Sequence, residues 1–361
     1  MERVRMKPED LRSAVAAGIL DEAQAARLKA LVDAREGRRA MMPSEDEPFE
    51  FFRGFSEIFI SIGLVILLTG VSAMLAWFGG FGLLVAVPLL TAGIAWWWAG
   101  YFTLRRRMTL PSMVLASAFG AGLLIFALTL FGRSGMDERM VAVLGFALSS
   151  AGMVLWYRRF RLPFSAFLTG CFVLGAIYAL TASTANLTGM MMGRGGLNGL
   201  FDLRESPAFA TATLLFGIGA FLVGMWFDTR DPHRLGRHAA TAFWCHLLAA
   251  PALVNTVAVT LLGGGGSGGI GLLAVALLAI TVLALVIDRR SFLTAAIAYI
   301  ALVIAWVMGE GDGAQWIFIL IVLGALITAI GTWWVQLRAV VMKALPDFPG
   351  KGRLPPYSMP E

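Results

Sequence analysis

The sequence predicts an all-α polytopic membrane protein with about ten transmembrane helices and a small cytoplasmic helical hairpin at its N-terminus. Composition supports this class, because 58% of the 361 residues are hydrophobic and only 14% are charged, with a mean hydropathy of +0.77. A chain of this composition cannot fold around one soluble core without leaving large apolar patches in water. We therefore expect the lipid bilayer to be its solvent and first partner.

Ten apolar runs divide the chain, and each is close to the roughly 20 residues that a helix needs to cross the hydrocarbon core. Helices satisfy the backbone hydrogen bonds of a lipid-embedded segment internally. No run contains Asp, Glu, Lys or Arg, which disfavours an ion path or a catalytic centre. The runs are approximately Ile58–Phe78, Phe81–Thr103, Leu110–Phe131, Met140–Tyr157, Pro163–Ala182, Ala208–Phe227, Ala239–Leu262, Ile270–Ile287, Ser291–Met308 and Trp316–Val335.

The positions of the basic residues predict the orientation of these helices. Of the 29 Lys and Arg residues, 25 fall before the first run, in the even-numbered links or after the last run. Cytoplasmic loops carry the excess of positive charge, so we expect both termini in the cytoplasm. A polar segment precedes the first run, so we expect that helix to stay as an anchor and not to be a cleaved signal peptide.

Residues 1–40 are expected to form the helical hairpin. Pro8 suits a first helical position, Gly18 a helix stop, and Asp21 with Gln24 a capping pair for a second helix. Residues 41–57 are acidic and then aromatic, which is typical of a linker that ends at the membrane interface. The transmembrane domain follows at 58–335, and a cytoplasmic tail with several prolines occupies 336–361.

The hairpin is predicted to bind a protein partner or to self-associate. A helix-turn-helix that binds nucleic acid is disfavoured, because the segment through Arg53 holds 11 acidic against 10 basic residues and so lacks a basic face. Its apolar stripe, which includes Leu11, Val15 and Leu28, is too small to form an independent core. These residues must be buried against the helix ends, a second copy or a partner.

Three stretches resemble a group of bacterial predicted inner-membrane proteins that carry an N-terminal domain of unknown function. They are "AVAAGILDEAQAARLKALVDAR", "EDEPFEFFRGFSEIFISIGLVILLTG" and the closing "WWVQLRAVVMKALP" with "GRLPP". The resemblance implies a bacterial inner-membrane location and a multispan build. It implies no activity, substrate or catalytic residue.

Glycine pairs two helical turns apart recur in five of the runs, and seven residues return to nearly the same helix face. Small residues let lipid-embedded helices approach closely, so these pairs are predicted to pack helices together. A sliding interface for alternating access is the alternative. The pairs are Gly63 and Gly70, Gly93 and Gly100, Gly145 and Gly152, Gly217 and Gly224, and Gly324 and Gly331.

Candidate chemistry within the runs is limited to four polar side chains: His246, Asn255, Tyr178 and Tyr299. His246 and Asn255 are nine residues apart and lie on nearly opposite faces of one helix, so they do not form one site there. An intramembrane His is a functional candidate, although interhelical hydrogen bonding is its usual role. No catalytic, cofactor or metal site is expected, since neither convergent acids and bases nor metal ligands occur.

Two links share the patterns "LWYRRFRLPFSAFLTG" and "LVIDRRSFLTA", and "WWWAGYFTLRRRMTLP" is a looser version. Both an internal duplication and the positive-inside rule alone explain this similarity. The expected function is a membrane scaffold or sensor with a partner-binding hairpin, and the alternative is a transporter or channel for a neutral or amphipathic small solute. The partner, the solute and the oligomeric state cannot be predicted from the sequence.

Overall fold

The computed structural model describes most of the chain in two compact units. Unit 1 comprises Met1–Pro48, Val223–Phe243 and Leu277–Glu361, and unit 2 comprises Phe49–Leu222 and Trp244–Ala276. All regular structure in the described part of the chain is helical. The described residues are 8–22, 24–25, 27–29, 55–78, 80–181, 197–231, 237–263, 266–289, 292, 317, 321, 324–325, 328–347, 350–351 and 354–355.

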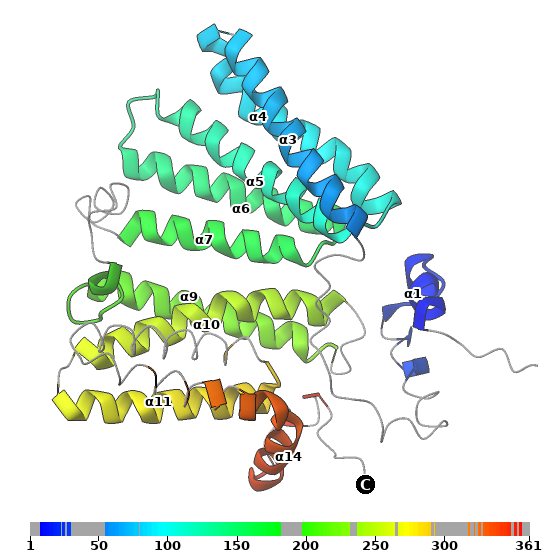
Figure 1. Ribbon diagram of the computed structural model, residues 1–361. Helices are drawn as coiled ribbons and strands as arrows, with labels where there is room; N and C mark the ends of the chain where they lie inside the picture. Colours follow the sequence, from blue (N-terminus) through cyan, green and yellow to red (C-terminus); the bar gives the residue numbers. More distant parts are fainter. Residues whose placement is uncertain are drawn as a thin grey trace, which may run out of the picture. The chain divides into compact units, whose positions relative to one another are not determined.

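Unit 2 contains a series of long helices that pack on one another in chain order (Figure 1). Helix α3 contacts both α4 and α5, α4 packs on α5, α5 on α6, and α6 on α7. A short π-helix, η2, continues α4 as far as Arg105. The bounds are α3 Phe55–Phe78, α4 Gly80–Ala99, η2 Gly100–Arg105, α5 Thr109–Phe131, α6 Glu138–Phe160 and α7 Phe164–Thr181.

Three further long helices contribute residues to both units. They are α9 (Pro207–Asp228), α10 (Arg237–Gly263) and α11 (Gly266–Ile287), and the short 3-10 helix η3 (Leu197–Leu200) precedes α9. The remaining helices, α1 (Pro8–Ala16) and α14 (Trp334–Ala344), belong to unit 1.

Among the described residues, seven helices are long and apolar enough to cross a membrane, and they coincide with the first seven predicted runs. The eighth run lies within α11. Of the ninth run only Phe292 is among the described residues, and the tenth is described at 317, 321, 324–325 and 328–335. Trp333 forms a turn before α14 begins at Trp334, so the segment predicted as the C-terminal tail starts with a helix.

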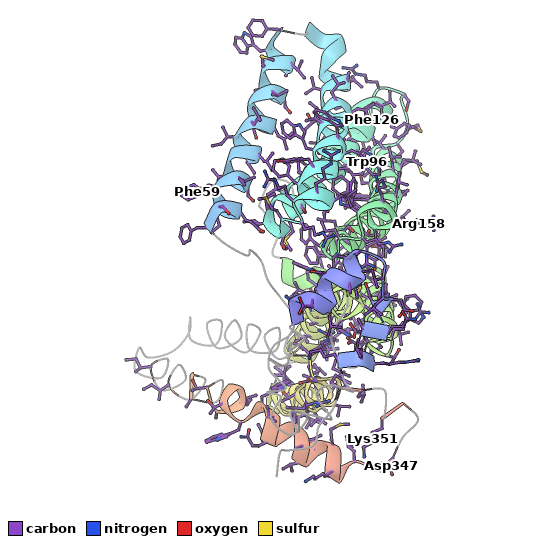
Figure 2. The ribbon with its side chains drawn as sticks, turned by 90° about the vertical axis from the view of Figure 1, so that its right-hand side faces the viewer. Phe59, Trp96, Phe126, Arg158, Asp347 and Lys351 are labelled. Atoms are coloured by element: carbon purple, nitrogen blue, oxygen red, sulfur yellow. The ribbon has the colours of Figure 1, made fainter. Side chains whose placement is uncertain are left out.

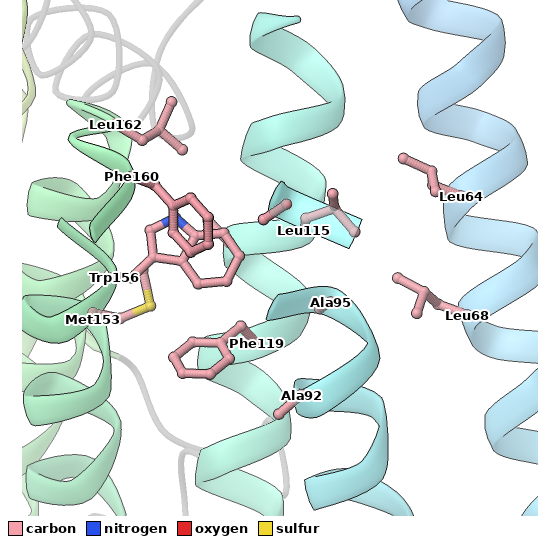
Figure 3. Close-up of a cluster of buried hydrophobic side chains, with 12 residues drawn as sticks. Leu64, Leu68, Ala92, Ala95, Leu115, Phe119, Met153, Trp156, Phe160 and Leu162 are labelled. Carbon is pink, nitrogen blue, oxygen red and sulfur yellow. The ribbon is translucent and has the colours of Figure 1, made fainter. Parts of the chain in front are cut away.

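A cluster of large aromatic and small aliphatic side chains fills the space between α3, α4, α5 and α6 (Figure 3). Trp156 of α6 is fully buried and lies edge-on to Trp96 of α4, with ring centroids 5.6 Å apart. Phe119 and Phe160 close the cluster on either side of the Trp156 ring, at 5.0 and 4.5 Å. Alanines at positions 92, 95 and 99 let α4 approach closely enough for these contacts.

The outer faces of these helices carry large exposed hydrophobic side chains. Phe59, at 69% exposure, projects from α3 away from the neighbouring helices (Figure 2). An apolar surface of this kind would be unstable in water but matches the acyl chains of a bilayer. The all-α membrane class predicted from composition is therefore seen in the folded chain.

The first helix ends as its sequence predicts. Helix α1 begins at Pro8, and Gly18 has a positive φ of +73°, a conformation that glycine adopts without steric cost. The backbone N–H of Asp21 then donates to Oε1 of Gln24 at 3.0 Å, while the Gln24 N–H donates to Oδ1 of Asp21 at 2.6 Å. This reciprocal pair is a capping box, although the helix that it opens is described only in part.

Candidate functional site

A cluster of buried acidic and basic side chains lies in unit 1 together with one tryptophan, and we call it the charge cluster. It consists of Asp228 at the end of α9, Asp288 and Arg289 directly after α11, and Trp334 and Arg338 on α14. All five side chains are nearly or fully buried, and the Arg289 side chain has no exposed surface.

Arg289 and Asp228 form a two-point ion pair. Nε of Arg289 donates to Oδ2 of Asp228 at 3.1 Å, and Nη2 donates to Oδ1 of the same carboxylate. Nη2 also donates to the carbonyl of Ala239 on α10 at 3.0 Å. The planar guanidinium suits such a paired geometry, and one side chain thereby joins the ends of α9, α10 and α11.

Asp288 and Arg338 form the second half of the charge cluster. The indole Nε1 of Trp334 donates to Oδ1 of Asp288 at 2.7 Å, and Nε of Arg338 lies 3.7 Å from the same oxygen. Arg338 also donates to the carbonyl of Leu285 at 3.0 Å and to that of Pro355 at 2.7 Å. The C-terminal segment is thus bound to α14 and α11 by one arginine.

Burial makes this cluster energetically demanding, because removing a charge from water costs several kcal/mol unless a partner and hydrogen bonds replace the solvent. The two acids and two bases of the cluster neutralise each other in pairs. The arrangement is therefore suited to fixing helix ends in one position, since loss of either partner leaves the other charge buried alone.

The N-terminal segment contacts the same end of α10. Oε1 of Glu22 accepts a hydrogen bond from Nε of Arg237 at 2.6 Å, and its Oε2 lies 3.6 Å from Nε2 of His238. The His238 ring stacks on Phe227 of α9, with centroids 5.7 Å apart. Asp231 accepts the backbone N–H of Ala239 at 3.4 Å. The first three residues of α10 are thus held by Glu22, Asp231 and Arg289.

Sequence reasoning missed this cluster, because Arg289 and Arg338 were assigned only to orienting the helices. Both arginines are buried in ion pairs. A signal was present: α9 ends in an aspartate, in "WFD", and an aspartate directly follows α11, in "VID". A carboxylate at a helix C-terminus opposes the helix dipole, so an acid retained there indicates a cationic partner nearby.

The prediction that charges are absent from the spanning stretches also needs correction, because the helices extend beyond the apolar runs. Glu57 belongs to α3 and is only 5% exposed. Its Oε2 accepts the backbone N–H groups of Thr109 and Leu110, at 3.1 and 3.2 Å. Met108, the residue before α5, makes no capping bond through its side chain, so a carboxylate from another helix caps α5.

The structure does not bring the four predicted polar candidates together into one site among the described residues. His246 is fully buried on α10 with its ring 5.5 Å from that of Phe221, and Asn255 is half-buried on the same helix. Tyr178 stacks on Phe209 at 4.3 Å, and its hydroxyl accepts a 3.4 Å hydrogen bond from Thr213. Tyr299 lies outside the described residues. In that described part, no group of three potential metal ligands occurs.

The ten predicted packing glycines fall into different surroundings. A Cβ added at Gly145, Gly152 or Gly217 would meet leucine side chains of a neighbouring helix. Gly224 is buried on α9. No described residue lies within 4 Å of such a Cβ at the other six positions, which are Gly63, Gly70, Gly93, Gly100, Gly324 and Gly331.

Two glycines outside the predicted pairs come equally close to the backbone of a neighbouring helix: a Cβ at Gly122 or at Gly269 would lie 2.6 Å from the carbonyl oxygen of Pro88 or of Leu261. A Cβ at Gly122 of α5 would lie 2.6 Å from the carbonyl oxygen of Pro88 on α4, and 3.1 Å from Cβ of Ala92. A neighbouring backbone cannot move aside as a side chain can, so Gly122 fixes the contact between α4 and α5.

Fold and charge cluster together define an all-α integral membrane protein whose helix ends are joined by buried ion pairs. Comparisons of the chain with family models, with curated proteins and with solved structures find no match. The resemblance to bacterial inner-membrane proteins therefore stays a prediction.

Proposed function

We propose that the chain is a scaffold or sensor of a bacterial inner membrane, with ten spans, both termini in the cytoplasm and an N-terminal hairpin that receives a protein partner. The contact of Glu22 with Arg237 and His238 carries this proposal. It joins the hairpin segment to the start of α10, at the residues next to the Arg289 bond to Ala239. A partner that moved the hairpin would therefore act directly on a helix that enters the membrane.

An exposed apolar residue supports partner binding at the hairpin. Ile19, in the turn after α1, is 74% exposed. A partner that bound at this turn would bury the side chain and gain the free energy of removing its apolar surface from water. The packed aromatic cluster around Trp156 further supports a rigid platform in the membrane region.

Site-specific photocrosslinking tests this proposal in cells. A photoreactive residue at position 19 should yield an adduct with a second protein or with a second copy of the chain. The same residue at Arg12, an exposed position in the middle of α1, serves as the matched control and should yield less. Glu22→Gln should change the adduct pattern at position 19. Equal or absent adducts at both positions would refute a partner-binding hairpin.

A transporter or channel for a neutral or amphipathic solute is the second candidate, favoured by the polar residues of α10. His246 and Thr256 are fully buried there, and Pro251 interrupts the helix hydrogen bonds. Cysteine accessibility separates the two functions. In a background with Cys171 and Cys245 replaced, cysteine at Asn255 should resist a membrane-impermeant thiol reagent if the chain is a scaffold. Labelling from either side of the membrane would favour an aqueous path.

A further inference from the structure

Unit 2 gathers six arginines at one end of its helices, and we call this group the arginine patch. Three follow each other at the end of η2, and three lie at the end of α6 and just beyond it. Helix α6 contacts η2, so the two groups are neighbours. All six residues are exposed: Arg105, Arg106, Arg107, Arg158, Arg159 and Arg161.

The arginine patch is not neutralised within the described residues, in contrast to the arginines of the charge cluster. Residues 55–181 contain only three acids, and two of them, Asp137 and Glu138, lie at the opposite end of α6. The third is Glu57, whose buried carboxylate is occupied by the N-terminus of α5. The patch therefore carries a concentrated positive charge that attracts an anion from outside the unit.

Aromatic side chains hold two of these guanidinium groups in place. Nε of Arg106 donates to the hydroxyl of Tyr101 at 2.9 Å, and its guanidinium lies 5.5 Å from the centre of that ring. The guanidinium of Arg159 lies 5.6 Å from the ring centre of Phe160. A guanidinium held against an aromatic ring loses less freedom on binding and keeps N–H donors at the edge of its plane for a phosphate.

Apolar surface begins directly beside the patch. Leu155 of α6, one turn before Arg158 and Arg159, is 56% exposed, and Val154 is 40% exposed. Leu104 in η2 is 37% exposed. Basic groups at a helix end next to an exposed aliphatic face match a molecule with an anionic head and a hydrocarbon tail.

We propose that the arginine patch binds the phosphate-bearing headgroup of an anionic phospholipid, with the acyl chains against α6 and η2. The positive-inside rule accounts for basic residues at this end, but it requires neither the aromatic supports nor the scarcity of acids in residues 55–181. Guanidinium groups bind phosphate through paired hydrogen bonds, which lysines do not provide. This site goes beyond the proposed scaffold function and stands whether or not the hairpin binds a partner.

Lipid titration of the full-length protein in detergent micelles, followed by native mass spectrometry, tests the proposal. The probes are phosphatidylglycerol, zwitterionic phosphatidylcholine and inorganic phosphate. Phosphatidylglycerol should bind most tightly, because phosphatidylcholine carries a compensating cation and inorganic phosphate has no acyl chain. Equal binding of inorganic phosphate would show a site for free anions and overturn the lipid assignment.

Paired variants make the test specific. Arg106→Gln with Arg159→Gln should weaken phosphatidylglycerol binding about 25-fold, at about fivefold for each basic group near the membrane surface. The matched control, Arg133→Gln with Arg139→Gln, removes two arginines at the other end of the same helices and should leave binding unchanged. Arg106→Lys with Arg159→Lys keeps the charge and should weaken binding by less than the Gln pair.

Two outcomes would overturn the proposal. Equal weakening by the Gln pair and the control pair would show that phosphatidylglycerol responds to total charge and not to this patch. Displacement of the lipid by a peptide of residues 41–54, seen with the wild-type chain and not with the Gln pair, would assign the patch to this chain's own acidic segment. An unchanged melting temperature of the Lys pair verifies that the fold is intact.

Discussion

Breaking the Arg289–Asp228 pair should destabilise the protein strongly. Arg289→Met leaves the Asp228 carboxylate buried without its bidentate partner. Asp228→Asn leaves the Arg289 guanidinium buried beside a neutral amide that cannot balance its charge. Removal of one partner from a buried ion pair costs about 3–5 kcal/mol. We expect each single variant to lose about that much unfolding free energy in mixed micelles.

The double variant separates pairing from simple loss of packing. With both charges removed, the remaining loss includes the Arg289 hydrogen bond to the Ala239 carbonyl, which contributes about 0.5–1.5 kcal/mol because that carbonyl also lies within the hydrogen-bond ladder of α10. Arg289→Met with Asp228→Asn should therefore be more stable than either single variant. Additive losses, or losses below about 1 kcal/mol in the single variants, would refute a coupled buried pair.

An ion pair in the same unit whose carboxylate is fully in solvent provides the control. Asp347 and Lys351 lie close together beyond α14, with Nζ 3.1 Å from Oδ1, and the Asp347 side chain is 99% exposed (Figure 2). Solvent-exposed pairs contribute little because water and salt screen them. Asp347→Asn should leave the unfolding transition unchanged, and a loss equal to that of Asp228→Asn would show that burial is not the cause.

Three further outcomes follow from the helices. Gly122→Ala should lower the unfolding free energy by about 1–3 kcal/mol, because the added Cβ would meet the Pro88 carbonyl. Gly70→Ala, which has open space around it, should leave the melting temperature in the same detergent unchanged. Equal effects of the two variants would refute the close approach. Glu57→Gln should cost about 0.5–2 kcal/mol by weakening the cap of α5, and a melting temperature equal to that of the wild type would show that the cap is dispensable. Reporter fusions within 104–109 and at 288–291 should report cytoplasm and fusions within 183–207 the opposite side; a cytoplasmic signal from the latter would refute the ten-span topology.

The apolar runs predicted the helices well because lipid permits few alternatives to a helix of this length. The bounds were too short wherever a charged residue joined the helix. Helix α6 runs from Glu138 to Phe160, beyond the predicted Met140–Tyr157 at both ends. Hydropathy cannot distinguish a charged residue in a loop from one in the terminal turn of a helix, so it underestimates the length of the helix.

Contacts between distant residues could not be predicted from periodicity. Asp228 and Arg289 are 61 residues apart, and nothing in one sequence states that they meet. Likewise, the glycine pairs indicated smooth faces, whereas a tighter backbone approach falls at Gly122, where an alanine and a proline carbonyl of α4 lie opposite. The spacing of glycines describes one helix, but close packing depends on both.

The links grouped by sequence similarity share a backbone feature that the similarity did not reveal. Arg107, Arg161 and Asp288 each have φ between 52° and 56°, the left-handed region that ends a helix. Glycine adopts this conformation without strain, yet each position holds a charged residue. Any helix that must end sharply uses the same conformation, so this shared feature does not require a duplication.

The distance along the chain between Asp228 and Arg289 has a consequence for biosynthesis. A ribosome that adds about 5–20 residues per second completes the intervening 61 residues in about 3–12 s. During that interval the end of α9 has left the ribosome while the arginine that neutralises its carboxylate does not yet exist. The three helix ends cannot lock together until α11 has been inserted, so a chain that stalls earlier would present an unneutralised aspartate to the proteases that survey the membrane.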